Sequence, residues 1–209
     1  MATSNAQRIG IWVIAVVMAV GTIGSFFVVI LANDNAKIDQ ASQASKQEEL
    51  NKKYQEYQDK VSAQADELSK THYPVFVAYK DKVAPFNKAD VTSVTTEDLK
   101  IGDGEEIQDG TKYSAYYIGW NPEGKIFDQS IDGEKLKSPI SGSGLIEGWT
   151  EGVKGMKIGG VRIITIPADK AYGDKGQGDD IPPHTPLKFL VYAIASPEEI
   201  PIPDFSGLQ

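Results

Sequence analysis

The sequence Gly-Leu-Ile-Glu-Gly-Trp at residues 144–149 decides the fold that we expect for this chain. Its tryptophan belongs to an apolar series of Ile146, Trp149, Val153 and Met156. Spacings of three and four residues place these side chains on one face of a helix. On spacing alone, Trp149 is either an ordinary core residue or the floor of a binding pocket, and the surrounding sequence has to decide between them.

Apolar and aromatic runs bounded by glycine and proline lie on both sides of this helix, at residues 112–119, 161–167 and 187–194. Runs of β-branched and aromatic residues between turn signals are typical of strands. Several strands with one convincing helix predict an α+β domain, in which an antiparallel sheet packs on a single short helix.

The composition excludes several classes of function. The chain has 209 residues, of which 41% are hydrophobic and 24% charged, and its net charge is −8. An acidic chain without a basic stripe does not suit nucleic acid. There is no cysteine and there are only two histidines, so disulfides, thiolate chemistry and a histidine-rich metal site have little material. We therefore expect no metal and no cofactor.

The N-terminus carries a long apolar segment. After a short polar tail at residues 1–8, residues 9–32 contain no charged side chain. As a helix they would span about 36 Å, more than the roughly 30 Å hydrocarbon core of a membrane. A cleavable signal peptide is the alternative, but its apolar region is shorter, about 7–15 residues, and ends in a small-x-small site. We predict a retained single-pass anchor in the cell membrane, with the large C-terminal part outside the cytoplasm, because long segments translocate largely regardless of charge.

Residues 33–93 are interpreted as a helical stalk and linker. Residues 36–70 contain neither glycine nor proline, which favours a helix, and the pair Tyr73-Pro74 is expected to end it. A heptad-like seam runs along this helix and consists of Leu50, Tyr54, Tyr57, Val61 and Leu68. Two readings stay open, a solvated stalk and a stalk that dimerises. Residues 75–96 have no assigned structure, and the proline-rich tail at residues 197–209 is expected to be extended.

Short motifs between residues 94 and 196 resemble the FKBP-type peptidyl-prolyl cis-trans isomerases, in the order and at close to the spacing of that family. They are Tyr-Ile-Gly at 117–119, Gly-Lys-Ile-Phe-Asp-Gln-Ser at 124–130, Leu-Ile-Glu-Gly-Trp at 145–149, Gly-Met-Lys-Ile-Gly at 155–159, Ile-Pro at 166–167, Ala-Tyr-Gly at 171–173, Ile-Pro-Pro at 181–183 and Leu-Lys-Phe at 187–189. The resemblance implies a bent antiparallel sheet wrapped around one short helix, and a membrane-anchored, bacterial-like member of the family.

The resemblance also implies a site between the sheet and the helix. Carried over by position, the catalytic residues are Tyr117, Phe127, Asp128, Ile146, Trp149, Tyr172 and Phe189, and the substrate-binding residues are Leu136, Leu145 and Ile181. Trp149 becomes the floor beneath a proline ring. The backbone N–H of Ile146 and the hydroxyl of Tyr172 would hold substrate carbonyls, and Asp128 would be a polar group beside the pocket rather than a general acid.

The implied activity is rotation of X-Pro bonds in polypeptide substrates, which requires neither metal nor cofactor. Assistance to the folding of exported proteins follows from the predicted location. A rival from another class is a non-catalytic module that uses the same pocket to hold proline-containing segments as a chaperone or scaffold. A third reading is a stalk-driven assembly protein.

Overall fold

The computed structural model describes residues 39–204 and divides the chain into two compact units. One unit is Lys60–Ile200, and of the other unit residues 39–59 and 201–204 are described. The predicted polar tail and membrane anchor, residues 1–32, lie outside the described residues. From residue 39 to residue 204, no helix has the length and apolar character needed to cross a membrane.

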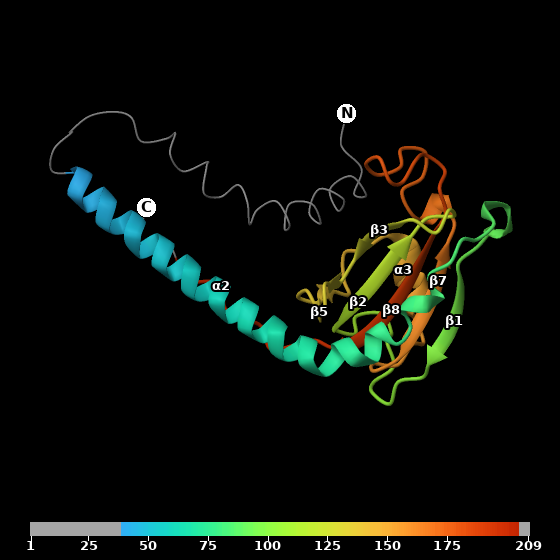
Figure 1. The fold of residues 1–209 in the computed structure, drawn as a ribbon, viewed down its shortest axis with the longest axis horizontal. Coiled ribbons are helices and arrows are strands. Elements are labelled where there is room, and N and C mark those ends of the chain that lie inside the picture. Colours follow the sequence, from blue (N-terminus) through green and yellow to red (C-terminus); the bar gives the residue numbers. More distant parts are fainter. Residues whose placement is uncertain (1–38, 205–209) are drawn as a thin grey trace. The chain divides into compact units, whose positions relative to one another are not determined.

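An antiparallel sheet forms the centre of the unit 60–200 (Figure 1). Its strand order is β1-β7-β8-β2-β3. The short β6 pairs with Ser114 and Ala115 of β2, on the edge of β2 that is not paired with β8. The strands are β1 (Thr95–Lys100), β2 (Tyr113–Trp120), β3 (Ile126–Gln129), β6 (Ile140–Ser141), β7 (Val161–Ile166) and β8 (Leu187–Ala195). A separate hairpin of β4 (Ile131–Asp132) and β5 (Lys135–Leu136) follows β3, and 3₁₀ turns occupy Lys80–Lys82, Lys88–Asp90 and Ala168–Lys170. The predicted antiparallel sheet is confirmed, with the three predicted runs forming β2, β7 and β8.

The predicted helix around Trp149 is also confirmed, as α3 (Glu147–Val153). It lies directly against β7 because glycine occupies the two helix positions that face this strand. A Cβ atom at Gly148 would lie 2.2 Å from Ile166, and one at Gly152 would lie 2.3 Å from Ile164, so no larger side chain fits at this distance. Gly155, with φ of +74°, adopts a left-handed conformation and stops the helix before Met156.

Alternation along the strands sends side chains to two separate cores. Alternate residues of β2, β7 and β8 face α3 and form the first core. Its buried members from these four elements are Tyr113, Ala115, Trp149, Val153, Ile164, Ile166, Leu187, Phe189, Val191 and Ala193. The intervening residues face the other way and form the second core, with Tyr116, Ile118, Trp120, Val161, Ile163, Leu190, Tyr192 and Ile194.

The second core is covered by the last turns of α2 (Asp39–Val77) and the segment that follows it (Figure 1). Phe76 is fully buried there, and Tyr73, Tyr79, Val83 and Phe86 are partly buried against the same cluster. The sequence predicted a boundary at residue 94, whereas the compact unit begins at residue 60. The end of the predicted stalk and the unassigned segment are therefore part of the globular unit.

The prediction that Tyr73-Pro74 ends the helix is wrong, since α2 continues to Val77. Proline inside a helix removes one hydrogen bond and costs about 3 kcal/mol. The extra turn places Phe76 in the second core, where full burial of a side chain of this size contributes about 1.5–3 kcal/mol. Tertiary packing of the last turn thus offsets much of the local penalty of Pro74.

In the other unit, residues 39–59 are helical. Leu50, Tyr54 and Tyr57 are half-buried, and the dimerising seam that they suggested stays a prediction.

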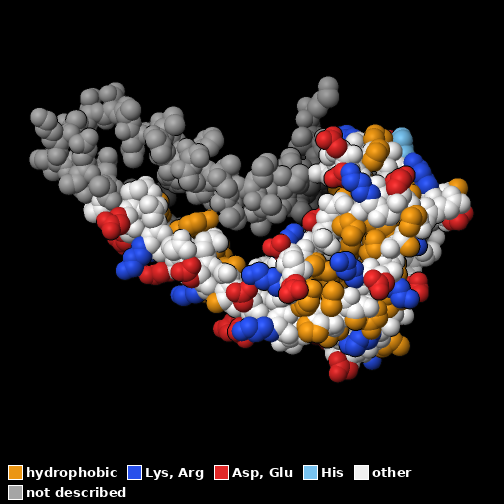
Figure 2. Space-filling view, in the orientation of Figure 1, with side chains coloured by type: hydrophobic (Ala, Val, Ile, Leu, Met, Phe, Trp, Pro, Cys, Tyr) orange, Lys and Arg blue, Asp and Glu red, His pale blue; other side chains and the backbone are white. Residues whose placement is uncertain are grey.

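On the face of the molecule in Figure 2, acidic and basic side chains are interspersed, and neither sign forms a large continuous field. This distribution agrees with the absence of a basic stripe in the sequence.

Candidate functional site

Four aromatic rings from three strands and one helix meet in the first core. Trp149 of α3 lies edge-to-face with Tyr117 of β2 and with Phe189 of β8, at centroid distances of 5.8 and 5.3 Å. Phe127 of β3 lies edge-to-face with Phe189 at 5.6 Å. Edge-to-face contact is a preferred arrangement of aromatic rings. The structure therefore brings together four residues that are up to 72 positions apart in the sequence.

Two of these rings are buried, as the floor of a pocket would be, and the other two are half-buried, as its walls would be. Trp149 and Phe189 are buried, at 2% and 5% exposure, whereas Tyr117 and Phe127 are half-buried. Gly119 lies beneath the ring contact, because a Cβ atom there would come within 2.8 Å of both Phe127 and Phe189. The absence of a side chain at this strand position lets the two rings meet.

The Trp149 ring is fixed by a residue that the sequence analysis missed. Its indole Nε1–H donates a hydrogen bond of 3.0 Å to the hydroxyl of Tyr113 in a buried position. Burial raises the pKa of Tyr113, so the hydroxyl is a neutral phenol, and the Trp149 bond opposes this shift only in part. Tyr113, Ala115 and Tyr117 lie on the same face of β2, so a two-residue period counted back from Tyr117 would have found it.

Tyr117 and Asp128 form a hydrogen-bonded pair at the edge of the rings. The hydroxyl of Tyr117 donates to one carboxylate oxygen of Asp128, and the other oxygen accepts the backbone N–H of Gln129 at 2.8 Å. Burial raises the pKa of Tyr117, and the hydrogen bond and the charge of Asp128 raise it further. Tyr117 therefore stays protonated and orients the carboxylate, which agrees with a role for Asp128 as a polar group.

Tyr172 lies beside the same carboxylate. Burial, first, and the charge of Asp128, second, raise the pKa of Tyr172, so its hydroxyl is a neutral donor. Ile146 is the N-cap of α3, and its N–H belongs to the first turn, where amides lack an acceptor within the helix. Leu145 and Ile146 are half-buried against the first core, and Ile181 is buried in it.

Nine of the ten predicted site residues thus belong to one region, and Leu136 does not. It is 2% exposed in the second core, on the opposite face of the sheet, together with Phe76. Its assignment to the edge of the site is corrected. The reason lies in the hairpin β4–β5, in which Leu136 pairs with Ile131 and both side chains turn toward the face that α2 covers.

One ion pair connects the turn before β3 with the loop before Ile181. Lys125 Nζ lies 2.5 Å from Asp180 Oδ1, and both side chains are largely exposed. Exposed pairs of this kind contribute little to stability. In the described part of the chain, no group of three His, Asp or Glu residues is arranged to hold a metal ion.

Comparison with known proteins places the sheet-and-helix part of the chain in a protein family. Residues 103–193 match the family model of the FKBP-type peptidyl-prolyl cis-trans isomerases. An FK506-binding protein of Neisseria meningitidis serogroup A is 43% identical over 100 residues, which are 47% of this chain and 92% of that protein. A probable FK506-binding protein of Corynebacterium glutamicum is 40% identical over 101 residues, 47% of this chain and 83% of that protein.

A peptidyl-prolyl cis-trans isomerase of Saccharomyces cerevisiae is 35% identical over 116 residues, which cover 56% of this chain but only 28% of the yeast protein. The matches to the two bacterial relatives cover most of their length, and the residues matched by the family model include β2, β3, β7, α3 and the aromatic rings described above. The chain belongs to the FKBP-type peptidyl-prolyl cis-trans isomerase family, and it is an enzyme of that type.

Proposed function

We propose that the aromatic cluster around Trp149 is the pocket in which this isomerase binds a substrate proline and lowers the barrier to rotation of the preceding bond. The observation that carries this proposal is the meeting of four rings around a buried indole, with two tyrosine hydroxyls and one carboxylate at their edge. A pyrrolidine ring is apolar and flat, which suits a surface of aromatic faces and edges.

The physical basis of catalysis is the difference between the planar and the twisted amide. Rotation of an X-Pro bond is opposed by amide resonance, with a barrier of roughly 18–20 kcal/mol. The twisted state has lost this resonance, so its carbonyl is less polar and its nitrogen is closer to an ordinary amine. An apolar site that excludes water therefore favours the twisted state over the planar one, which is differential binding of the transition state.

The polar groups give this pocket its orientation. The N–H of Ile146 and the hydroxyl of Tyr172 would hold the carbonyls of the substrate backbone on either side of the rotating bond. Asp128, held by Tyr117, would be a polar group beside the pocket. None of these steps transfers a proton or forms a covalent bond, so pocket shape and fixed dipoles carry the whole effect.

Proline isomerisation without a catalyst takes tens of seconds or longer and limits the folding of many chains. We infer that the protein accelerates such steps in exported or surface proteins. The experiment is refolding of a model protein whose slow phase is set by a proline, with full-length protein added in catalytic amounts. The slow phase should accelerate in proportion to enzyme concentration, with no change in the fast phase.

The same refolding experiment separates the isomerase from a non-catalytic binding module. A module that only holds proline-containing segments would slow the phase or lower its amplitude, and its effect would saturate at one equivalent. Catalysis needs far less than one equivalent. A folded sample that acts only stoichiometrically would replace the folding-assistance proposal with the chaperone or scaffold alternative.

The uncharged segment at residues 9–32 supports a proposed location at the membrane with the isomerase unit outside the cytoplasm. Protease added to spheroplasts that express the protein tests this orientation. Digestion of the C-terminal part without lysis is the expected result, and its survival until lysis would reverse the proposed orientation.

A further inference from the structure

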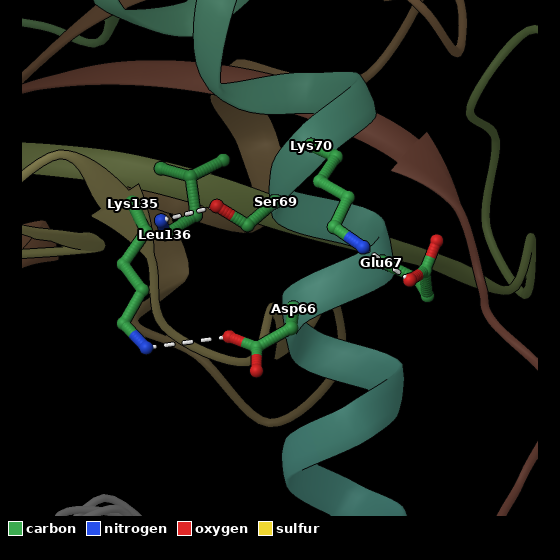
Figure 3. A network of polar contacts seen from close by, with 6 residues as sticks. All are labelled: Asp66, Glu67, Ser69, Lys70, Lys135 and Leu136. Carbon is green, nitrogen blue, oxygen red and sulfur yellow. Dashed lines mark hydrogen bonds and ion pairs between the residues drawn. The ribbon is translucent and has the colours of Figure 1, made fainter.

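The contacts between α2 and the hairpin β4–β5 lie outside the predicted site. A series of hydrogen bonds nevertheless connects this hairpin with Tyr117, which belongs to the site. The hydroxyl of Ser69 on α2 accepts the backbone N–H of Leu136 at 2.8 Å, in a buried position. One turn earlier on the helix, Asp66 forms an ion pair with Lys135, and its Oδ1 lies 3.3 Å from Lys135 Nζ. Figure 3 shows both side chains pointing from α2 toward the hairpin.

The two contacts differ in weight. Asp66 and Lys135 are largely exposed, at 50% and 61% of their side-chain surface, so their attraction is screened by water. Ser69 is 4% exposed and Leu136 is 2% exposed. A buried N–H that loses its acceptor keeps the full cost of its desolvation, so Ser69 is the contact that fixes the hairpin.

The hairpin in turn holds the strand that carries Tyr117. Next to Leu136, the N–H of Lys137 donates to the carbonyl of Ser130 at 2.9 Å. Ser130 is buried and bonds Tyr117 twice: its N–H donates to the Tyr117 carbonyl at 2.8 Å, and its hydroxyl accepts the Tyr117 N–H at 2.9 Å. Tyr117 then bonds the Asp128 carboxylate.

We propose that Ser69 is a positioning residue for the isomerase site, which acts through the hairpin β4–β5 and Ser130 on the Tyr117–Asp128 pair. Ser69 bonds Leu136, which lies in the second core on the face of the sheet opposite the aromatic rings. The proposal rests on the function proposed above for the aromatic cluster, and it makes the end of α2 a working part of the catalytic unit. Ser69, Leu136 and Ser130 are buried members of this series of hydrogen bonds, so a shift at Ser69 has few ways to be absorbed before it reaches Tyr117.

The test uses the full-length protein and an X-Pro peptide, with kcat and KM measured separately. Ser69→Ala should lower kcat about five-fold, the scale of one modest hydrogen bond, and should leave KM nearly unchanged. Lys70→Ala is the matched control, because Lys70 is the next residue on α2 and pairs with Glu67 inside the helix (Figure 3). It should leave both constants unchanged.

A double-mutant cycle distinguishes positioning from a general loss of stability. If Ser69 acts through Tyr117, Ser69→Ala in a Tyr117→Phe background should change kcat by less than about two-fold. An equal factor in both backgrounds, or an unchanged kcat in folded Ser69→Ala protein, would overturn the proposal. Should Ser69→Ala not fold, Ser69→Cys is the second variant, because it keeps an acceptor atom at the γ position, although a larger and weaker one, and it must show the same dependence on Tyr117. Failure of both variants to fold would assign Ser69 a purely structural role. Failure of the proposed pocket is a separate outcome, in which wild-type protein is itself inactive.

Discussion

Trp149 is both a structural and a functional residue, and these two roles make separate predictions. Its ring is in contact with Tyr117 and Phe189, and its N–H is bonded to Tyr113. Removal of a buried aromatic ring of this size leaves a cavity that the rigid sheet cannot close. The consequences should therefore appear in stability as well as in substrate binding.

Trp149→Ala should lower the free energy of unfolding by about 3–5 kcal/mol and abolish measurable isomerase activity. Denaturant titration and a peptide assay measure the two effects.

Trp149→Phe and Trp120→Phe form a matched pair of milder changes. Trp120 is 1% exposed in the second core and donates its own N–H to Ala84 at 2.9 Å. Each phenylalanine variant loses the hydrogen bond of one indole N–H, but only Trp149→Phe should lower kcat/KM. Equal activity of the two would contradict a floor at Trp149.

Tyr172→Phe removes one hydroxyl and leaves the ring. Stability should change by less than about 1 kcal/mol, while kcat/KM should fall about five- to tenfold, because the lost hydrogen bond is made to the substrate. Tyr116→Phe is the control. Among the described residues its buried hydroxyl has no hydrogen-bond partner, and burial raises its pKa to about 12. It should keep full activity, and a Tyr172→Phe variant that does the same would remove Tyr172 from the proposed site.

At the residue scale, the resemblance to the family supplied the candidate site, but it could not assign side chains to a face where the register was ambiguous. Trp149, Tyr117 and Phe127 come together as expected. Leu136 lies in a hairpin of two-residue strands, and in such short strands a shift of one residue moves every side chain to the opposite face. Nothing local in the sequence indicated that register, and the contact that Leu136 makes with Ser69 joins residues 67 positions apart.

At the scale of elements, the strands themselves carried a signal of the second core. β2 reads Tyr-Ser-Ala-Tyr-Tyr-Ile-Gly-Trp and is buried or half-buried at every position. A sheet with one face in water shows polar residues at alternate positions, whereas a strand covered on both faces is continuously apolar. The end of α2 was interpreted as stalk because Pro74 is a local stop signal, and the packing of Phe76 that overrides it is visible only in three dimensions.

The contact of α2 with the sheet should depend on pH through His72. Its Nδ1 lies 3.0 Å from the hydroxyl of Tyr192, and its ring lies 5.8 Å from that of Tyr116. Burial lowers the pKa of His72 from 6.5. The unfolded chain therefore takes up the proton first as the pH falls, so stability is full above pH 6.5 and declines below it until the lowered pKa is passed.

Thermal unfolding between pH 8 and pH 5 measures this effect. Wild-type protein should lose more stability over that range than His72→Gln, and the difference between the two curves should begin near pH 6.5. Parallel curves for the two proteins would show that His72 does not titrate with folding.

At the scale of the whole molecule, the boundary of the folding unit follows from the second core. A fragment of residues 60–209 keeps Phe76 and the segment after it, whereas a fragment of residues 94–209 leaves the large buried side chains of the second core without cover. Each such side chain contributes about 1.5–3 kcal/mol when fully buried. Loss of several approaches the total stability of a domain, about 5–15 kcal/mol.

We expect the fragment 60–209 to unfold cooperatively at nearly the temperature of the full-length protein, and the fragment 94–209 to be aggregated or partly unfolded. Calorimetry and light scattering on the two fragments measure this difference. Equal unfolding temperatures would mean that α2 is dispensable for the fold, and that the boundary expected from the sequence at residue 94 is the physical one.

The proposed function is catalysis of X-Pro bond rotation by the rings around Trp149. Exchange NMR on an X-Pro peptide, with full-length wild-type protein at a small fraction of the peptide concentration, tests it most directly. Without a catalyst, interconversion of the cis and trans forms takes tens to hundreds of seconds. It should become faster in proportion to the protein added. Trp149→Phe should lose most of this acceleration, whereas Trp120→Phe should keep it. Interconversion no faster than in buffer, from a sample shown to be folded, would mean that these rings do not catalyse the rotation.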